Sequence, residues 1–479
     1  MMLRSYLLLT LAALWTLQIA NAASEIEYNT TETTTLGNAL YVAAEGDQLK
    51  AMATLMLAEE DNALSKEADL TRLYLADALN GQGLVQEASQ YYLLIGNNSA
   101  AKQRLRDTAW LHYAKLKHEL GEHDAAMKAL QNIQKSLSDT QESEAAIIKA
   151  HALLAAGKIN EAVDAVPGSI KHDSLWTLYQ RYNLGNLLLG EHNNKYGAAV
   201  LHKLSEIDTE KHPELAALKD QANLTLGFSL LKISKASKAR SYLQQVRLNN
   251  LMSNMALLGM GWSYAIEEEY ERALVYWIEL YNRPLSSTYR YESALAIPYA
   301  FGQAHAFNQS VSYYKAALDR FAGDSVTMSA AKAALSSPRF VALISSTAND
   351  ETGWINNWQP DASAPESQFV PLFMDSPEFQ LALKEYRALL QLNSYVVAMS
   401  SEIMAQEKES GASLPQLRQQ HEQLIRNINQ AIKAKQVTLQ QLASNILDRY
   451  QKQLAQYLQQ ARFGMAQVIE QATQKQGDE

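Results

Sequence analysis

A small residue recurs along this chain at a nearly constant interval, each time five positions after a predicted turn. The intervals between successive copies are 37, 38, 36, 37, 40, 34 and 37 residues. A period in the thirties indicates one supersecondary unit copied in tandem, because a single copy cannot bury its own apolar face. The sequence therefore predicts a solenoid, whose recurring small residues are Ala51, Ala88, Ala126, Ala162, Ala199, Ala239, Ala273 and Ser310.

The unit from Ser253 to Pro284 shows the pattern most clearly. Apolar and small residues fall on one face of a first helix, a turn follows at residues 267–269, and a second helix repeats the arrangement. Small residues let the two helices of a hairpin approach closely, and large residues fill the space between neighbouring hairpins. The residues that define these two faces are Leu257, Gly261, Tyr264, Ala273, Trp277 and Leu280.

This unit resembles the tetratricopeptide repeat, which places a bulky residue, Leu-Gly and Tyr on its first helix and Ala, an aromatic residue and Ala on its second. The resemblance covers residues 35–336, and the repeat array is assigned to residues 23–336. It implies an all-α, tetratricopeptide-like superhelix of helical hairpins. It says little about function, because such a fold is a scaffold onto which different sites are grafted.

The resemblance also implies a partner-binding groove, lined by the first helix of each hairpin. In the earlier units the groove positions hold polar residues, among them Asp77, Asn80, Lys115 and His118. In the later units they are apolar or aromatic, which predicts a binding stripe for a protein or peptide segment. The alternative is that superhelical overlap buries this stripe as ordinary core. The stripe consists of Leu224, Phe228, Leu231, Leu258, Trp262, Leu295 and Tyr299.

The first residues have the pattern of a secretory signal peptide. One cation, Arg4, precedes an apolar run, and a small-x-small motif ends at Ala22, so cleavage is expected between Ala22 and Ala23. The alternative is a membrane anchor, but the run is shorter than the roughly 20 residues that span a bilayer. Residues 1–22 are therefore assigned to a signal peptide, and no stable membrane insertion is expected after its removal.

Composition narrows the compartment and the partners. The chain has no cysteine, which is common in bacterial periplasmic proteins and unusual in large secreted eukaryotic ones. We therefore expect the periplasm of a Gram-negative bacterium. The formal net charge is -9 with no basic stripe, which argues against nucleic acid as a partner.

Residues 337–376 are proline-rich and lack a helical period, so they predict an irregular connector. Trp354 and Trp358 lie within it, four positions apart. Exposed tryptophans often anchor a partner. The alternative is that both rings cap the open end of the last repeat, since a solenoid needs its terminal apolar face covered.

Residues 377–475 predict a C-terminal arm of two long amphipathic helices. The first runs to about Glu407, and the second runs from about Leu414 to Thr473 with apolar residues three and four positions apart. Sixty helical residues would reach roughly 90 Å. The first helix, folded back as a coiled-coil-like hairpin, covers only about half of that stripe. Either a second copy, forming a homodimer through the arm, or another helical partner is expected to cover the rest.

The sequence offers no recognisable chemistry. It lacks the zinc-protease, serine-hydrolase and phosphate-loop motifs, and no catalytic, metal-binding or cofactor-binding residue is predicted. His112 and His118 do not share a helix face as zinc ligands would, and His123 falls in the following turn.

We therefore expect a non-catalytic periplasmic scaffold that holds an envelope protein. The settings that fit are transport or energy transduction, polysaccharide export, and cell-wall machinery. The alternative is the superhelical region of a cell-wall-active enzyme such as a lytic transglycosylase, although no lysozyme-like domain is recognisable in the sequence.

Overall fold

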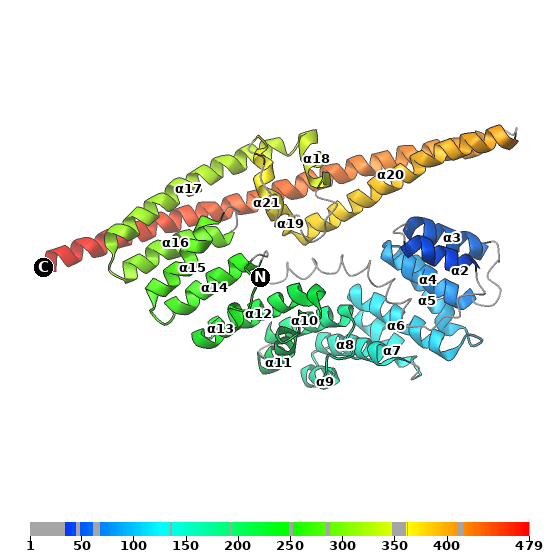
Figure 1. Ribbon diagram of the computed structural model, residues 1–479, viewed down its shortest axis with the longest axis horizontal. Coiled ribbons are helices and arrows are strands. Elements are labelled where there is room, and N and C mark those ends of the chain that lie inside the picture. The colour runs from blue at the N-terminus through cyan, green and yellow to red at the C-terminus, as the bar shows by residue number, and fades with distance from the viewer. Residues whose placement is uncertain are drawn as a thin grey trace. The chain divides into compact units, whose positions relative to one another are not determined.

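The computed structural model describes residues 34–44, 48–60, 68–134, 137–190, 194–248, 252–283, 288–346, 361, 363–410 and 415–478. The predicted cleavage site at Ala22 and Ala23 and the tryptophans Trp354 and Trp358 lie outside these ranges. Within them every regular element is a helix (Figure 1). The predicted all-α fold of repeated, tetratricopeptide-like helical hairpins is confirmed. Residues 10–222 and 223–479 form two compact units.

The unit 10–222 consists, where it is described, of consecutive helical hairpins. A short 3-10 helix, η2 (Pro213–Leu215), follows the last of them and leads into α12 (Ala216–Leu231), within which the boundary between the units falls. The hairpins are α2 (Thr34–Ala44) with α3 (Gln48–Glu60), α4 (Ala68–Gly81) with α5 (Val85–Asn97), α6 (Gln103–Glu119) with α7 (His123–Gln131), α8 (Asp139–Ala155) with α9 (Ile159–Ala165), and α10 (Leu175–Gly190) with α11 (Asn194–Ser205).

The unit 223–479 continues with hairpins and ends in long helices. Its hairpins are α12 with α13 (Ala236–Leu243), α14 (Ser253–Ala265) with α15 (Tyr270–Asn282), and α16 (Thr288–Gln303) with α17 (Phe307–Ala334). After them come α18 (Pro338–Ser346), η4 (Pro365–Phe369), α19 (Val370–Met374), α20 (Pro377–Ser410) and α21 (Pro415–Asp478). None of the helices in the described ranges is both long and apolar enough to span a membrane.

The recurring small residue has a fixed place, because it is the fourth residue of the second helix in each hairpin. The copy that contains Ala199 corrects one expectation. Ala199 is exposed, and Gly197, the fourth residue of α11, takes the small-residue position. A Cβ atom at Gly197 would lie 2.7 Å from the carbonyl oxygen of Gly185, so the two helices meet there backbone to backbone.

The turn between the two helices is also repeated. In six hairpins the first helix ends in a Schellman motif, in which a backbone N–H reaches back five residues to a carbonyl, as from Leu84 to Leu79. The residue before that N–H has positive φ. In the unit 10–222 this residue is glycine, whereas in the unit 223–479 it is not, and the six are Gly83, Gly121, Gly157, Ser234, Glu268 and His305.

The hairpin of α14 and α15 shows how small and large residues fit together. Trp277 is fully buried, and its indole nitrogen donates a hydrogen bond to the carbonyl of Leu258 at 3.3 Å. A Cβ atom at Gly261 would overlap the indole ring of Trp277. Glycine at this position therefore leaves room for the ring of Trp277 between the two helices, and in this unit Met260-Gly261 takes the place of the Leu-Gly element of the repeat.

The segment predicted as an irregular connector contains helices. Within 337–376, α18, η4 and α19 are helical, and prolines stand in the first turn of each, where the missing N–H is not needed. The prolines here mark the starts of helices. The prediction of an irregular connector was therefore wrong for residues 338–346 and 365–374. Phe340, Phe369 and Phe373 are buried in a hydrophobic core that also includes α16, α17, α20 and α21.

The arm packs against its own chain along both halves. Toward its N-terminal end α21 lies on α20, where His421 donates a hydrogen bond to the carbonyl of Val396 at 2.5 Å. Toward its C-terminal end it lies beside α17, which has 28 residues, far more than the other second helices (Figure 1). A Cβ atom at Gly464 would overlap the hydroxyl of Tyr314, which shows how closely α17 and α21 approach.

This packing supplies the cover that the sequence analysis sought outside the chain. The C-terminal half of the stripe on α21 is buried against α16 and α17 through Leu454, Ala461 and Val468. Lys332 on α17 pairs with Asp448 on α21 at 2.5 Å. Helix α17, the last helix of the array, therefore covers the half of the stripe from which a homodimer was inferred.

Candidate functional site

A group of neighbouring, partly exposed aromatic rings comes from three consecutive helices of the unit 223–479. Trp262 on α14 is partly buried, and its indole nitrogen donates a hydrogen bond to a carboxylate oxygen of Glu292 on α16 at 3.1 Å. Its ring centroid lies 6.5 Å from that of Tyr299 on α16 and 5.0 Å from that of the buried Trp277. Trp277 thus supports Trp262 from below, while Glu292 fixes its orientation.

Tyr299 is the most accessible ring of this group, with 41% of its surface exposed. Tyr270, the first residue of α15, stands edge-on to it with 6.4 Å between ring centroids. Burial raises the pKa of Tyr270, and a side-chain hydrogen bond with Tyr299 adds to this rise. We call Trp262, Tyr270 and Tyr299 the aromatic triad. They come from α14, α15 and α16, so the repeat itself brings them together.

The other residues of the predicted stripe have different surroundings. Leu224 and Leu258 are only 9% and 3% exposed, so they belong to the core between hairpins, as the alternative interpretation had it. Phe228 and Leu231 are partly buried against the core around α13. The solvent-accessible part of the stripe is thus centred on Trp262 and Tyr299, and Tyr270 is the member that the sequence analysis missed. It opens a second helix, whereas only first-helix positions were considered.

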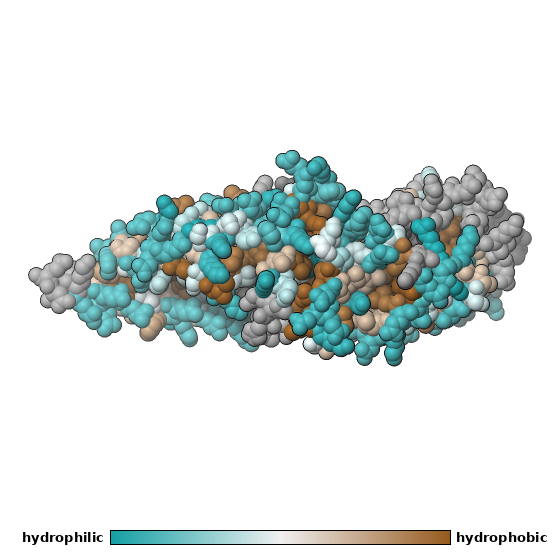
Figure 2. Space-filling model, turned by 90° about the horizontal axis from the view of Figure 1, so that it is seen from below, coloured by the Kyte–Doolittle hydropathy of each residue, from teal (hydrophilic) through white to brown (hydrophobic). Residues whose placement is uncertain are grey.

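The face of α16 that would continue the groove is partly covered by α21. Leu295 packs against the core that includes α21, and a Cβ atom at Gly302 would lie 3.3 Å from the side chain of Val468. Helix α21 therefore lies against α16 near Leu295 and Gly302. On the face shown in Figure 2, hydrophobic residues surface in patches among hydrophilic ones.

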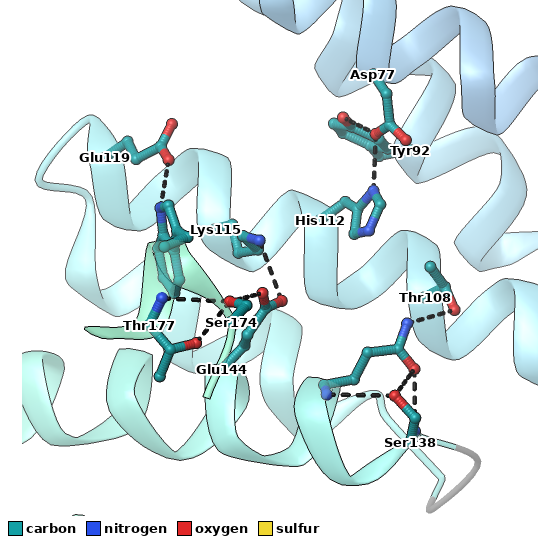
Figure 3. A network of polar contacts seen from close by, with 12 residues as sticks. Asp77, Tyr92, Thr108, His112, Lys115, Glu119, Ser138, Glu144, Ser174 and Thr177 are labelled. Atoms are coloured by element: carbon teal, nitrogen blue, oxygen red, sulfur yellow. Dashed lines mark hydrogen bonds and ion pairs between the residues drawn. The ribbon is translucent and has the colours of Figure 1, made fainter. Parts of the chain in front are cut away.

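Two of the polar groove positions of the unit 10–222, Asp77 and Lys115, make contacts across hairpins (Figure 3). Asp77 on α4 accepts a hydrogen bond from the hydroxyl of Tyr92 on α5 and contacts Nδ1 of His112 on α6, each at 2.7 Å. The pair of Asp77 and His112 therefore joins two neighbouring hairpins. These side chains act first as structural links, because their hydrogen-bonding capacity is used within the unit.

Lys115 makes the next link along the same unit. Its ammonium pairs with Glu144 on α8 at 3.0 Å and stands 4.5 Å from the ring centroid of Trp176 on α10. The other carboxylate oxygen of Glu144 accepts from the hydroxyl of Ser174 at 2.7 Å, as Figure 3 shows. One lysine and one glutamate thus connect α6, α8 and the start of α10.

Three histidines gather between α6, α7 and α8. The ring centroid of His118 lies 4.8 Å from that of His151 and 5.8 Å from that of His123. His151 donates from Nε2 to the backbone carbonyl of Gln180 at 2.9 Å. Burial lowers the pKa of His118 and lowers that of His151 to about 3, so both rings are neutral near pH 7.

His112 lies apart from this histidine cluster, in contact with Asp77. Within the described residues, no group of three or more His, Cys, Asp or Glu side chains is placed to hold a metal ion. The sequence analysis missed His151 as a neighbour of His118 because the two lie on separate first helices. Counted back from the turn glycine of each hairpin, His118 and His151 lie three and six residues away, on the same face of their first helices, and this shared face is the signal that could have paired them.

Comparison with known proteins adds little beyond the fold. No protein-family model matches the chain, and no curated protein matches its sequence. Among solved structures, the chain is similar to a tetratricopeptide repeat protein from Parabacteroides merdae, at 13% identity and a TM-score of 0.27, over 59% of this chain and 90% of that one. It is also similar to a chain of the APC/C hetero-tetramer Cut9–Hcn1, at 15% identity and a TM-score of 0.22, over 87% and 89%. A chain of Naa15/Naa10 bound to HypK gives 13% identity and a TM-score of 0.17, over 92% and 81%. Because the TM-scores are this low, the fold rests on the hairpins themselves.

Proposed function

We propose that this protein is a non-catalytic scaffold that binds a segment of a partner protein through the aromatic triad. The observation that carries the proposal is Tyr299, a large aromatic side chain that stays 41% exposed beside the partly exposed Trp262. Aromatic residues on a rigid helical support are the usual anchors of protein interfaces. A scaffold role also fits a fold whose helices present an extended surface.

The periplasm of a Gram-negative bacterium is the compartment we propose, on the strength of the predicted cleavage between Ala22 and Ala23 and the absence of cysteine. The partner would then be an envelope protein in transport or energy transduction, polysaccharide export or cell-wall machinery. Amino-terminal sequencing of the protein from a periplasmic extract should begin at Ala23. A chain that starts at Met1 in the membrane fraction would contradict this assignment.

A homodimer through the arm loses its original support, because α16, α17 and α20 bury the stripe on α21. The enzyme alternative, part of a lytic transglycosylase, has no support from a lysozyme-like domain, since α20 and α21 occupy most of the chain's C-terminal region. A protein partner is therefore the function that we test.

The test is capture of envelope proteins by the immobilised mature protein, followed by a binding measurement on the purified partner. Tyr299→Ala and Trp262→Ala should each weaken binding by about 2 kcal/mol, or roughly thirtyfold. Val326→Ala shortens an apolar side chain of α17 that is 71% exposed, and it is the control for a change of surface hydrophobicity outside the triad. Thermal melts separate binding from folding. Unchanged affinity in a folded Tyr299→Ala variant would contradict the proposal.

A further inference from the structure

The aromatic triad has acidic neighbours without cationic partners. The carboxylate of Glu292 accepts a hydrogen bond from Trp262 but forms no ion pair with any described residue. Glu268 is exposed in the turn before Tyr270 and raises the pKa of that tyrosine by its charge. It too has no salt bridge within the described ranges. The triad is thus an aromatic surface with negative charge at its edge and no positive charge opposite.

The same hairpin contains an aromatic group that does have its cations. The rings of Tyr264 and Tyr276 are stacked, with 5.6 Å between centroids. The guanidinium of Arg240 lies 4.5 Å from the centroid of the Tyr264 ring. Arg240 also pairs with Glu267 at 2.7 Å. On this side of the hairpin, the guanidinium of Arg240 therefore contacts both a stacked tyrosine ring and a carboxylate of the turn.

The two groups differ in one component. Both combine aromatic rings with a glutamate from the turn at residues 267–269, and both include rings from α14 and α15. The group around Tyr264 has its cation within the chain, whereas the aromatic triad has none and leaves Tyr299 open to solvent. The face of an aromatic ring attracts a cation, and the attraction grows when a carboxylate stands close by. The missing component is therefore a positive charge.

We propose that the aromatic triad and Glu292 bind one lysine or arginine side chain of the partner segment. The cation would stand against the ring of Tyr299, its alkyl stem would contact Trp262, and the carboxylate of Glu292 would balance its charge. This inference rests on the proposed function, because it names the chemistry by which the scaffold selects its partner.

The indole N–H of Trp262 is a direct probe, because it points to Glu292. In an ¹⁵N-labelled sample its resonance is assigned by its absence in Trp262→Phe. The titrants are a short Gly/Ser/Ala peptide with one central arginine and an otherwise identical peptide with glutamine. The arginine peptide should shift the resonance and bind roughly fivefold or more tightly than the glutamine peptide, since a cation–π contact contributes about 0.5 to 2 kcal/mol.

Three variants identify the groups involved. Tyr299→Ala and Glu292→Gln should each reduce the preference for arginine by about threefold or more, whereas Tyr299→Phe, which keeps the ring, should retain it. Equal binding of the two peptides, or no shift with either at millimolar concentration, would overturn the inference. The proposed function fails separately. If capture of a partner depends on Tyr299 but is unchanged by Glu292→Gln, the proposed scaffold function stands and only the cation site is contradicted.

Discussion

The two compact units use the same hairpin but join their hairpins by different chemistry. In residues 34–222 the apolar contacts between neighbours are accompanied by polar links, as in the pair of Asp77 with His112 and the pair of Lys115 with Glu144. In residues 223–335 large aromatic rings stand between neighbours, as around Trp277 and Trp262, and the ion pair of Arg240 with Glu267 lies beside them. The hairpin itself requires only a small fourth residue in its second helix and a turn residue with positive φ. The side chains between hairpins can vary, and they determine which polar and aromatic contacts join neighbouring hairpins in each unit.

The units also differ in the range of their contacts. A repeat array normally has contacts only between neighbouring units. The unit 223–479 departs from this rule, because α21 returns to α16 and α17 across a long stretch of sequence. Its last hairpin is therefore covered by the chain's own arm.

The largest expected effect concerns this cover. Gly464→Val would drive a branched side chain into the ring of Tyr314, and overpacking of this kind costs roughly 2 to 3 kcal/mol. Hydrogen exchange should rise in the facing segments of α17 and α21 and stay unchanged in α4 to α9. Ala466→Val, at an exposed position two residues away, is the control. If both variants behave alike, the close approach of α17 and α21 is wrong.

The second expected effect is a pH dependence of opposite sign in the two units. Between pH 3 and pH 6.5 the unfolded chain binds a proton at His151 that the folded chain excludes, so the contribution of His151 to the free energy of unfolding falls as the pH drops through this range. The loss from His151 between pH 7 and pH 5 should be about 2 kcal/mol, and the lowered pKa of His118 acts in the same direction. In the unit 223–479, burial raises the pKa of Asp375 to about 7, so the contribution of Asp375 rises as the pH drops below 7.

His151→Gln keeps an N–H donor for the carbonyl of Gln180 but cannot be protonated. Chemical denaturation at a series of pH values should therefore show a smaller loss of stability toward low pH, or a larger gain, for this variant than for the parent protein. His172→Gln, at a half-exposed histidine that pairs with Asp139, should retain the slope of the parent protein. If the free energy of unfolding changes equally with pH in all three proteins, the buried histidines do not contribute to the pH dependence of the unit 10–222.

The smallest expected effect compares the turns of the two units. Gly121→Ala places a Cβ atom at a φ of 75° and should destabilise its hairpin by about 1 kcal/mol. Ser234→Gly relieves the same strain at a φ of 56°, and should stabilise by about 0.5 kcal/mol because glycine also adds entropy to the unfolded chain. Differences in the denaturation midpoint measure both. Changes of the same sign would mean that the turns are not equivalent.

The sequence predicts most of the array because its determinants are local. The small residue and the turn are fixed within one hairpin, and they could be read from spacing alone at every copy but the one containing Ala199. There, Gly197 rather than Ala199 lies at the fourth helical position. The groove was harder to predict, because burial of Leu224 and Leu258 depends on how neighbouring hairpins overlap.

The contact between α21 and α17 could not be predicted from the local sequence pattern, although α17 contains one signal of it. Buried residues on α17 continue at helical spacing past the length of a repeat helix, at Phe321, Met328 and Leu335. This continued apolar face indicates a partner for α17, although it does not name α21. Pairing two amphipathic helices more than a hundred residues apart requires knowledge of the three-dimensional path.

The return of α21 to α17 also determines the order in which the molecule can fold. Lys332 and Asp448 are 116 residues apart, whereas each hairpin turn closes over about five. Hairpins can therefore form quickly and locally, while docking of the arm must wait for a large loop to close. During synthesis the facing residues of α21 are made more than a hundred residues after those of α17. Until they arrive, α17 exposes an apolar face, and a chain cut short before residue 450 would keep that face exposed and become prone to aggregation.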